Sequence, residues 1–357
     1  MSTLLILAML LLAAPAGAQD VQITAFGARC DGVTDDTRAI QAAATALPAG
    51  ASLIFAGPAA CRVNGTIVVS VGPVVIRGPG IVEQVCGTCD TFLLRSATAI
   101  VIRDLIVNDA SGGPSGGWAI AFSGEQLNTR SRISNVQINH TFHGIRLTNA
   151  VGYAVYGNTL NARATNIQVD ASLSPHSDES RIFGNLFGCR GPACQTHIEI
   201  NSGGGLEITG NKFLGGTTGI GFDLRASSSS LVIVGNQMEN QSASSMDFGC
   251  GGFHWGSIVV SGNHLGASRG SYIRLGHAGQ ASAVCPESVV IVGNESDNAP
   301  THVELQAGRD IFIGSNLFRA GGVGVYAAPG VSVAVCGNFI TAAQRYVGGG
   351  QYLSACD

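Results

Sequence analysis

Charged side chains recur at the third position of a short motif, and these are the residues of the sequence that could do chemistry. Each copy of the motif has apolar residues at its second and fourth positions, as in His197-Ile198-Glu199-Ile200. The third-position residues are Arg146, Gln168, Glu199, Asp223, Asp247, Arg274 and Glu304. If each copy is a strand, its apolar residues face inward and its third residue faces solvent. Stacked strands would then place three carboxylates in a row between two arginines.

Stacked carboxylates are costly, and this cost favours a catalytic role for them. Like charges on neighbouring strands destabilise a sheet, and one carboxyl of a close pair retains its proton near neutral pH. Hydrolysis of a glycosidic bond uses such a pair, because one carboxyl protonates the leaving oxygen while the other activates water or attacks carbon. We predict that Asp223 and Asp247 are the catalytic pair and that Glu199 is a third catalytic residue. The alternative is a solvated ladder of charges, with or without a bound Ca²⁺.

Residues around these carboxylates are suited to binding an acidic sugar. Arginines such as Arg274 pair with the carboxylates of uronates through two hydrogen bonds. His197 and Tyr272 occupy the first motif position, which we also expect to face solvent, and the loop 249–256 brings aromatic rings next to Asp247. The predicted substrate-binding residues are Arg146, Gln168, Asp170, His197, Arg225, His254, Trp255, Tyr272 and Arg274. No metal ligands are predicted.

A glycine-asparagine pair that returns along the chain indicates which elements position these residues. The pairs are Gly157-Asn158, Gly184-Asn185, Gly210-Asn211, Gly235-Asn236, Gly262-Asn263, Gly293-Asn294 and Gly337-Asn338, with a degenerate copy at Ser315-Asn316. Seven steps lead from Asn158 to Asn338, so the mean period is (338−158)/7, about 26 residues. Periods of this size are typical of solenoids. We expect the asparagines to form a structural ladder of hydrogen bonds at one turn, because asparagine tolerates left-handed geometry.

The segments between these pairs are short β-branched runs divided by Gly, Asn and Ser, without helical periodicity. A coil of three short parallel strands closes in about 25 residues, and stacked coils bury a shared apolar column. The 50 glycines suit a chain that turns three times per coil. We therefore predict an all-β fold, a single-stranded right-handed parallel β-helix.

The N-terminal region differs from the repeats. We expect a strand from Ile23 to Cys30 and then a helix that begins near Thr34, with Asp36 in its first turn, and runs to about Leu47. Its apolar face comprises Ala39, Ile40, Ala43 and Leu47. A lone amphipathic helix before a solenoid is expected to cover the open apolar end of the first coil.

The segment from Gln22 to Ala43, with Phe26-Gly27, Asp31-Gly32 and Asp35-Asp36-Thr37, resembles the opening of the pectate-lyase-like superfamily of right-handed β-helices. That superfamily also includes rhamnogalacturonases, polygalacturonases, epimerase-like proteins and phage tailspike domains. The resemblance implies the solenoid and its capping helix and leaves the reaction open. It covers about the first 45 residues, and the later coils are similar in pattern only.

Composition and the first residues bear on the compartment. Of 357 residues, 45% are hydrophobic and 12% are charged, and the net charge of −4 offers no basic surface for nucleic acid. The apolar run from Leu4 to Ala14 is followed by Ala16-Gly17-Ala18, which indicates a signal peptide cleaved after Ala18. We predict a secreted or periplasmic protein without a membrane anchor. Its predicted parts are the signal peptide 1–18, an N-terminal strand and capping helix 19–50, the β-helix 51–345 and a C-terminal cap 346–357.

All ten cysteines follow the predicted cleavage site, which suggests disulfide bonds in an oxidising compartment. The expected local pairs are Cys86/Cys89, Cys189/Cys194 and Cys336/Cys356, which leaves Cys30/Cys61 and Cys250/Cys285. Zinc binding by Cys86 and Cys89 is the alternative, although no second ligand pair lies at the required spacing.

Three functions remain open from the sequence. The leading hypothesis is a glycoside hydrolase of an extracellular, pectin-like acidic polysaccharide, which needs no cofactor. The first alternative is a polysaccharide lyase, in which Arg274, Arg225, Tyr272 or His197 would act as the base and the acids would hold Ca²⁺. The second is a non-catalytic glycan-binding or surface structural protein. The expected partner is a polysaccharide, and the protein is either a monomer or a homotrimer.

Overall fold

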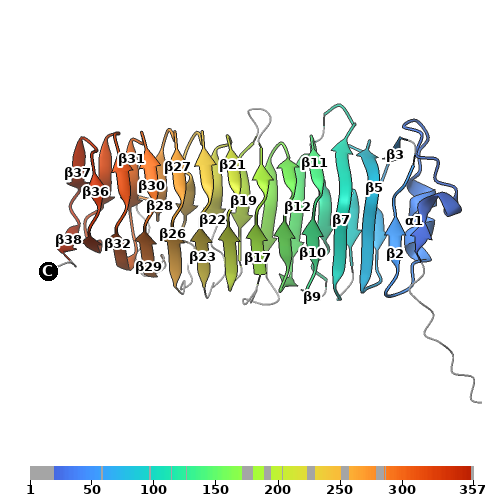
Figure 1. The fold of residues 1–357 in the computed structure, drawn as a ribbon, viewed down its shortest axis with the longest axis horizontal. Coiled ribbons are helices and arrows are strands. Elements are labelled where there is room, and N and C mark those ends of the chain that lie inside the picture. Colours follow the sequence, from blue (N-terminus) through green and yellow to red (C-terminus); the bar gives the residue numbers. More distant parts are fainter. Residues whose placement is uncertain are drawn as a thin grey trace, which may run out of the picture.

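The computed structural model describes residues 20–354 apart from 58, 96–97, 114, 126, 171–179, 189–193, 203, 223–229, 251–256, 279–284 and 286. The described chain winds into a long stack of coils, with strands running side by side along its walls (Figure 1). The predicted signal peptide lies outside the described residues. No helix among the described residues is long and apolar enough to cross a membrane.

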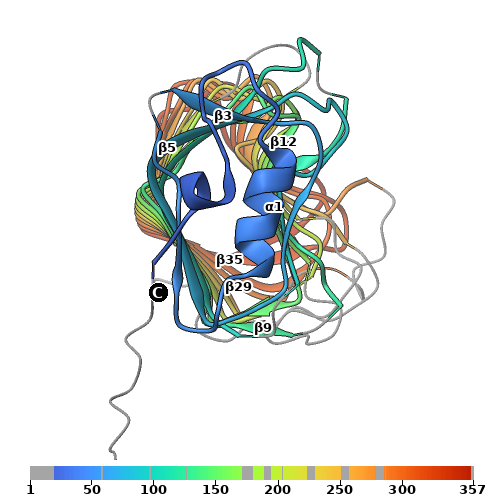
Figure 2. The same ribbon diagram turned by 90° about the vertical axis from the view of Figure 1, so that its right-hand side faces the viewer.

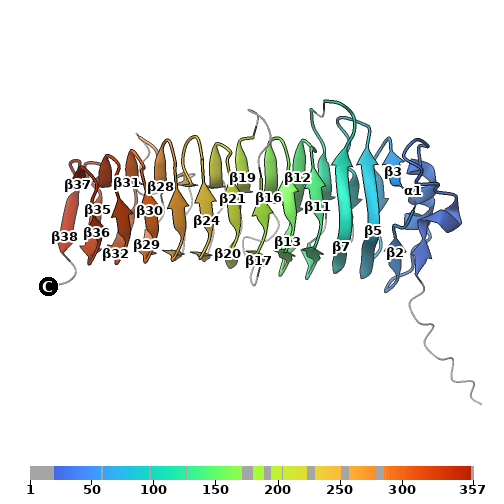
Figure 3. The ribbon, with the colours of Figure 1, turned by 45° about the horizontal axis from the view of Figure 1, so that its top comes forward.

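One wall is a 12-stranded parallel sheet to which each successive coil adds a strand. Its strands are β4 (Ile67–Val69), β6 (Phe92–Leu94), β8 (Trp118–Phe122), β12 (His143–Thr148), β16 (Thr165–Asp170), β19 (Thr196–Ile200), β22 (Thr218–Phe222), β25 (Met246–Phe248), β28 (Ser271–Leu275), β31 (Thr301–Leu305), β34 (Val323–Ala327) and β37 (Gln344–Val347). Neighbouring strands in this wall come from consecutive coils, so residues far apart in sequence lie side by side (Figure 3).

The other two walls belong to a 24-stranded sheet that bends at the Gly-Asn turns. Its first row contains β1 (Val21–Gln22), β2 (Ser52–Ile54), β10 (Arg132–Ser134), β14 (Ala154–Tyr156), β17 (Ser180–Phe183), β20 (Leu206–Thr209), β23 (Leu231–Val234), β26 (Ile258–Ser261), β29 (Glu287–Val292), β32 (Arg309–Gly314), β35 (Ser332–Cys336) and β38 (Gln351–Ser354). Its second row contains β3 (Ala60–Val63), β11 (Gln137–Asn139), β15 (Thr159–Asn161), β18 (Leu186–Phe187), β21 (Lys212–Leu214), β24 (Gln237–Glu239), β27 (His264–Gly266), β30 (Glu295–Asp297), β33 (Leu317–Arg319) and β36 (Phe339–Ile340). The long strands β5 (Val74–Gln84) and β7 (Ile100–Asp109) run through both rows, and β9 (Asn128–Thr129) pairs with β13 (Ala150–Val151) at a corner.

These parallel coils confirm the predicted β-helix. Residues at equivalent positions stack in register, as Ile145, Ile167, Ile198 and Ile220 do in the twelve-stranded sheet. All four are fully buried and belong to one apolar core that runs through the coils. Each such aliphatic side chain contributes about 1.5–3 kcal/mol by leaving water.

The predicted asparagine ladder is also confirmed. The Nδ2 atom of Asn211 donates to Oδ1 of Asn236 at 3.0 Å and to the carbonyl oxygen of Ile182 at 2.8 Å. The same pattern repeats from Asn158 to Asn338 and includes Asn316 of the degenerate copy. Ser315 adopts the same left-handed conformation as the glycines at this turn, with φ of 53°. The ladder therefore satisfies turn carbonyls that would otherwise be buried without partners.

The N-terminal end carries the predicted capping helix with different boundaries. Helix α1 spans Thr37–Thr45, and it lies across the open end of the first coils (Figure 2). Ile40 and Ala43 of its apolar face are fully buried. Before it, the structure has the short strand β1 and the 3₁₀ helix η1 (Ile23–Phe26), so the predicted strand from Ile23 to Cys30 is wrong.

The aspartates near α1 have structural roles, although Asp36 does not cap the first turn of the helix as expected. Asp36 makes no side-chain cap to the helix. It is buried and accepts hydrogen bonds from the backbone amides of Arg29 at 2.7 Å and Cys30 at 3.0 Å. Asp31 accepts a hydrogen bond from the backbone amide of Thr34 at 2.7 Å. Hydrogen bonds of this kind lower the pKa of the Asp31 carboxyl to about 2. Both carboxylates fix the chain where it enters the first coil.

Disulfide bonds join Cys30 to Cys61, Cys86 to Cys89 and Cys250 to Cys285. All three were among the expected pairs, and the Cys86–Cys89 bond removes the zinc alternative at that motif. Cys194 and Cys336 are also disulfide-bonded, while the partners predicted for them, Cys189 and Cys356, lie outside the described residues.

The coil pattern continues beyond the boundary predicted for the C-terminal cap at residue 345. Strand β37 pairs with β34, and β38 pairs with β35, both in parallel. The last described residues therefore still belong to the solenoid.

Candidate functional site

The candidate site lies on the outer face of the twelve-stranded sheet. The pairing of β12, β16, β19, β22, β25, β28 and β31 places one outward-facing residue of each strand in a single column. In order, the column contains Arg146, Gln168, Glu199, Gly221, Asp247, Arg274 and Glu304. Acidic residues therefore do come together between Arg146 and Arg274.

Gly221 occupies the column position predicted for Asp223, so the prediction of three adjacent carboxylates is wrong. Gly221 pairs with Glu199 on one side and with Asp247 on the other. The apolar pattern allows either Gly221 or Asp223 at this position of the column, because a shift of two residues leaves the apolar side chains facing inward. The register depends on the lengths of the loops in the two coils, which the motif does not contain. Asp223 itself lies outside the described residues.

Gly221 leaves a gap between the two remaining carboxylates. Glu199 and Asp247 are two strands apart, which corresponds to about 9.6 Å between their backbones. A Cβ atom at Gly221 would meet only side chains, with Cγ2 of Thr196 at 3.2 Å and Cγ2 of Thr218 at 3.7 Å. None of these contacts is to backbone, so Gly221 leaves the space between the acids bounded by the side chains of Thr196 and Thr218.

Asp247 is held from two directions. The guanidinium of Arg274 donates through Nε to Oδ1 at 2.9 Å and through a terminal nitrogen to Oδ2. His277 places Nε2 3.2 Å from Oδ1 of the same carboxylate. The Asp247 side chain is only 17% exposed, so these contacts fix its orientation in a partly dehydrated place. In return, the hydrogen bonds to Asp247 raise the pKa of Arg274 further.

Glu199 has no hydrogen bond or ion pair with another described residue, and it is half-buried between Gln168 and Gly221. Asp170, at the end of β16, accepts a hydrogen bond from the hydroxyl of Ser202 at 3.1 Å. Glu199 and Asp247 thus differ. Asp247 is already engaged by Arg274 and His277, whereas the oxygens of Glu199 accept no hydrogen bond from a described residue.

At the other end of the column, Arg146 belongs to an aromatic cluster. Its guanidinium lies 5.6 Å from the ring centre of Trp118 and 3.5 Å from Oδ2 of Asp90. The ring of His143 stacks on that of Trp118 at 4.3 Å. Burial, together with the charge of Arg146, lowers the pKa of His143 to about 4, so this imidazole is neutral at neutral pH. The cluster holds Arg146 on the outer face of β12.

His197 and Tyr272 do not face solvent, which corrects the prediction for the first motif position. Both side chains are fully buried. Nε2 of His197 donates to the carbonyl oxygen of Gly215 at 2.9 Å, and the hydroxyl of Tyr272 donates to the carbonyl oxygen of Asp297. In both strands the residue of the pair and the isoleucine after it, Ile198 or Ile273, are buried. The polar side chain turns inward because it satisfies a backbone carbonyl that would otherwise be buried without a partner. Neither residue can touch a substrate on the outer face.

Three other predicted substrate-binding residues, Arg225, His254 and Trp255, lie outside the described residues. Conversely, His277, Asp90 and Trp118 join the site without having been predicted. His277 follows Arg274 by three residues, just past the end of β28, which is the only sequence signal for it. Asp90 and Trp118 precede the first recognisable copy of the motif.

No metal site is evident on this face among the described residues. Within that part of the chain, the one group of potential ligands close enough to share an ion is Cys30, Asp36 and Cys61. The two cysteines form a disulfide, and Asp36 is used by backbone amides. These residues have a structural role at the entrance to the first coil.

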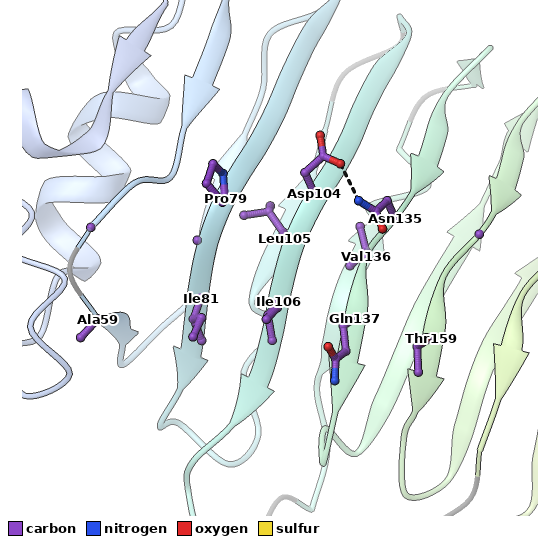
Figure 4. Close-up of a pocket in the computed structure, with 13 residues that line it drawn as sticks. Ala59, Pro79, Ile81, Asp104, Leu105, Ile106, Asn135, Val136, Gln137 and Thr159 are labelled. Carbon is purple, nitrogen blue, oxygen red and sulfur yellow. Dashed lines mark hydrogen bonds between the residues drawn. The ribbon is translucent and has the colours of Figure 1, made fainter.

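A separate hollow of about 520 Å³ lies on the 24-stranded sheet (Figure 4). Its floor is mainly apolar, with Pro79, Leu105 and Ile106 among its lining residues. Its carboxylate, Asp104, accepts a hydrogen bond from Asn135 at 2.7 Å and lies 3.3 Å from Arg103. With a single carboxylate that is already paired, this hollow lacks the pair of acids found on the other sheet.

No family model and no curated protein matches the sequence. Solved structures do match the fold. The A-module of the mannuronan C-5 epimerase AlgE4 of Azotobacter vinelandii has a TM-score of 0.70 at 14% identity, covering 94% of this chain and 100% of that one. A GH87 α-1,3-glucanase catalytic unit of Streptomyces thermodiastaticus has a TM-score of 0.64 at 17% identity, covering 96% and 71%. PfbA, a surface adhesin of Streptococcus pneumoniae, has a TM-score of 0.66 at 13% identity, covering 94% and 93%.

These similarities concern the fold, since all the identities are below 20%. The chain has a right-handed parallel β-helix fold, as the sequence predicted, and the solved structures share that fold. The three neighbours are an epimerase, a glucanase and an adhesin, so the fold alone leaves the reaction undecided. Function has to be argued from the site.

Proposed function

We propose that this protein is a secreted or periplasmic glycoside hydrolase that binds an acidic polysaccharide along the outer face of the twelve-stranded sheet. The observation that carries the proposal is the placement of Glu199 and Asp247 on either side of Gly221. Several glycan-active enzymes among the fold neighbours support the carbohydrate class. The disulfide bonds support an oxidising compartment.

In the proposed reaction the two carboxyls have different roles. Asp247 accepts hydrogen bonds on both oxygens, as an ionised carboxylate does, and is suited to activating water. Glu199 has no cation beside it among the described residues and is suited to carrying the proton for the leaving oxygen. The sugar would lie over Gly221, which adds no side chain of its own beside those of Thr196 and Thr218. Arg274 acts as a positioning residue that fixes Asp247.

Arg146 and Arg274 support the choice of an acidic substrate. They lie in the column on either side of Glu199 and Asp247, and each is more than one quarter exposed. A guanidinium that already shares one carboxylate retains donors for a second one. Uronates bound across several coils would bring their carboxylates to these two arginines.

The central test compares Glu199→Gln and Asp247→Asn with the native protein on pectic, alginate-type, rhamnan and bacterial exopolysaccharides. Release of reducing ends is expected from at least one polymer, and each variant should lower it by about 10²–10⁴-fold because proton transfer or water activation is lost. Glu83→Gln, a half-buried carboxylate on β5 of the other sheet, is the matched control and should retain full activity. Two variants with native activity would refute the assignment. Asp223→Asn in the same assay tests the residue whose position is not described.

The stereochemistry of the product gives an independent test of the geometry. Carboxyls about 6.5–9.5 Å apart suit inversion, and those about 5 Å apart suit retention. The backbones of Glu199 and Asp247 are about 9.6 Å apart, close to the upper limit for inversion and far from the separation for retention. Proton NMR of the fresh product should therefore show the inverted anomer first. Retention of the anomeric configuration would indicate that the second catalytic carboxyl lies closer to Asp247 than Glu199 does.

A lyase of the same fold is the second candidate, and the described residues offer it less support. His197 and Tyr272, two of its proposed bases, are buried, and Arg274 is bound to Asp247. A lyase would produce an unsaturated product that absorbs ultraviolet light, and a chelator would stop it if Ca²⁺ binds the acids. The hydrolase should release reducing ends without this absorbance and should be insensitive to the chelator.

A non-catalytic glycan-binding protein is the third candidate, and the adhesin among the fold neighbours supports its consideration. Such a protein would retain polysaccharide without releasing any product. Glu199→Gln and Asp247→Asn would then leave every assay unchanged.

A further inference from the structure

A second concave surface lies at the corner where the coils leave the twelve-stranded sheet and enter β14 and β17. We call it the arginine hollow and define it by Arg130, Arg132, Ala154, Tyr156, Arg181 and Phe183. Its volume of about 840 Å³ falls within the range of ligand-binding pockets. It shares no residue with the column that contains Glu199 and Asp247.

The arginines of this hollow are only partly neutralised. Arg181 lies 3.1 Å from Glu207, and its side chain is still 62% exposed. Arg130 and Arg132 are exposed and have no ion pair or hydrogen bond from their side chains to other described residues. A chain with a net charge of −4 has no general excess of cations to explain this concentration. The local charge favours an anionic ligand.

The register spaces the arginines along the solenoid. Arg132 on β10 pairs with Ala154 on β14, which pairs with Arg181 on β17. The two arginines are therefore about 9.6 Å apart at the backbone, with only a methyl group between them. This arrangement leaves a floor on which an extended ligand can lie parallel to the solenoid axis, with anionic groups at intervals along it.

An aromatic pair borders this floor. The rings of Tyr156 and Phe183 stack with centres 4.9 Å apart and planes 5° from parallel. Because they stack on each other, they are less able to receive the bases of a nucleic acid, which need free ring faces. They offer rigid apolar contact beside the guanidinium groups, an arrangement that suits the apolar faces and carboxylates of a uronate chain.

We infer that the arginine hollow is a second, non-catalytic site that binds a uronate-bearing polysaccharide through guanidinium–carboxylate pairs. The substrate class rests on the proposed function. The site would hold the polymer on a different wall of the solenoid from the carboxylates, so that one chain contacts the protein at two places. Arg130 and Arg132, whose side chains pair with no described residue, supply donors to the ligand, and Arg181 shares its donors between Glu207 and the ligand.

The test is isothermal titration of the full chain carrying Asp247→Asn, which prevents turnover, with polygalacturonate and with alginate. The double variant Arg130→Gln/Arg132→Gln should weaken the binding of at least one polymer by about tenfold or more, because charge-assisted hydrogen bonds are lost. The control Arg309→Gln/Arg319→Gln removes the same charge from exposed arginines elsewhere and should bind within about twofold of the parent. Neutral dextran should not bind.

Three results would overturn the inference. The first is equal affinity of the double variant and the control, and the second is no binding of either uronan. The third is binding of a single-stranded oligonucleotide as tight as that of the uronans and equally sensitive to Arg130 and Arg132, which would show a general polyanion surface.

The outcome is separable from that of the proposed function. In the protein without Asp247→Asn, the double variant should raise KM for the polymer and leave kcat on a short oligosaccharide unchanged. If no polymer is degraded at all, the proposed hydrolysis fails, while the titrations still decide whether the hollow binds uronans.

Discussion

At the scale of single residues, the candidate site depends on one residue without a side chain. Gly221 separates Glu199 from Asp247, and a Cβ atom at this position would touch only threonine side chains. An acidic residue here would have produced the adjacent carboxylates that the motif suggested. The observed arrangement avoids direct repulsion and leaves room for a sugar between the acids.

Gly221→Val tests whether this space is functional. The Cβ atom of valine would press on Cγ2 of Thr196 at 3.2 Å, so the free energy of unfolding should fall by about 1–3 kcal/mol. Its methyl groups would occupy the gap, and misplacement of the substrate should lower kcat/KM by about 10–100-fold. Gly113→Val, in an open loop position, is the control and should be neutral in both measurements. Native activity of Gly221→Val would show that the substrate does not pass between the two carboxylates.

At the scale of elements, the asparagine ladder holds successive coils together. Asn211 donates to Asn236 and to Ile182, and it accepts hydrogen bonds from both the amide and the side chain of Asn185. All these groups are buried, so removal of one asparagine leaves several polar atoms without partners. Each asparagine turn is therefore stabilised by hydrogen bonds to the turns of the coils before and after it.

Asn211→Ala should therefore destabilise the protein strongly. Each buried polar group that loses its partner costs about 1–3 kcal/mol, so a loss of at least roughly 3 kcal/mol is expected. Chemical denaturation followed by circular dichroism measures it. Asn64→Ala, at an exposed asparagine outside the ladder, should change stability by less than about 0.5 kcal/mol. Equal effects of the two substitutions would mean that the ladder contributes little.

At the scale of the whole molecule, buried histidines make the solenoid sensitive to acid. His197 and His302 lie inside the coils, and burial lowers the pKa of both, that of His197 to about 4. Nδ1 of His197 lies 2.8 Å from Nδ2 of Asn166, and its Nε2 donates to Gly215. The imidazole is therefore neutral, and protonation would replace the bond from Asn166 with a repulsive contact.

The expected consequence is a loss of stability between about pH 6.5 and pH 4. The unfolded chain binds a proton at His197 below about pH 6.5, whereas the native chain does so only near pH 4, so the free energy of unfolding falls as the pH falls through this window. For this residue alone the full loss is roughly 3 kcal/mol. His197→Gln should flatten the pH profile of urea denaturation midpoints. An unchanged profile would show that His197 does not cause the acid sensitivity.

The repeating architecture follows from the order of residues alone. The spacing of the Gly-Asn pairs, the apolar alternation and the amphipathic face of α1 each follow from local backbone geometry and side-chain burial, so they could be predicted. Asp247 and Arg274 were correctly placed on one face because they occupy the same position in consecutive coils. Such features depend on the order of residues within one coil.

Which residues of different coils lie opposite each other depends on how the coils stack, and this could be seen only in the folded structure. Equal steps of 24 residues would align Glu199, Asp223 and Asp247, but the observed steps to and from Gly221 are 22 and 26 residues. Loops of unequal length set this register, and a shift of two residues costs nothing in the apolar pattern. The inward turn of His197 and Tyr272 was equally hidden, because it depends on carbonyls of neighbouring turns that only the stacked coils bring within reach.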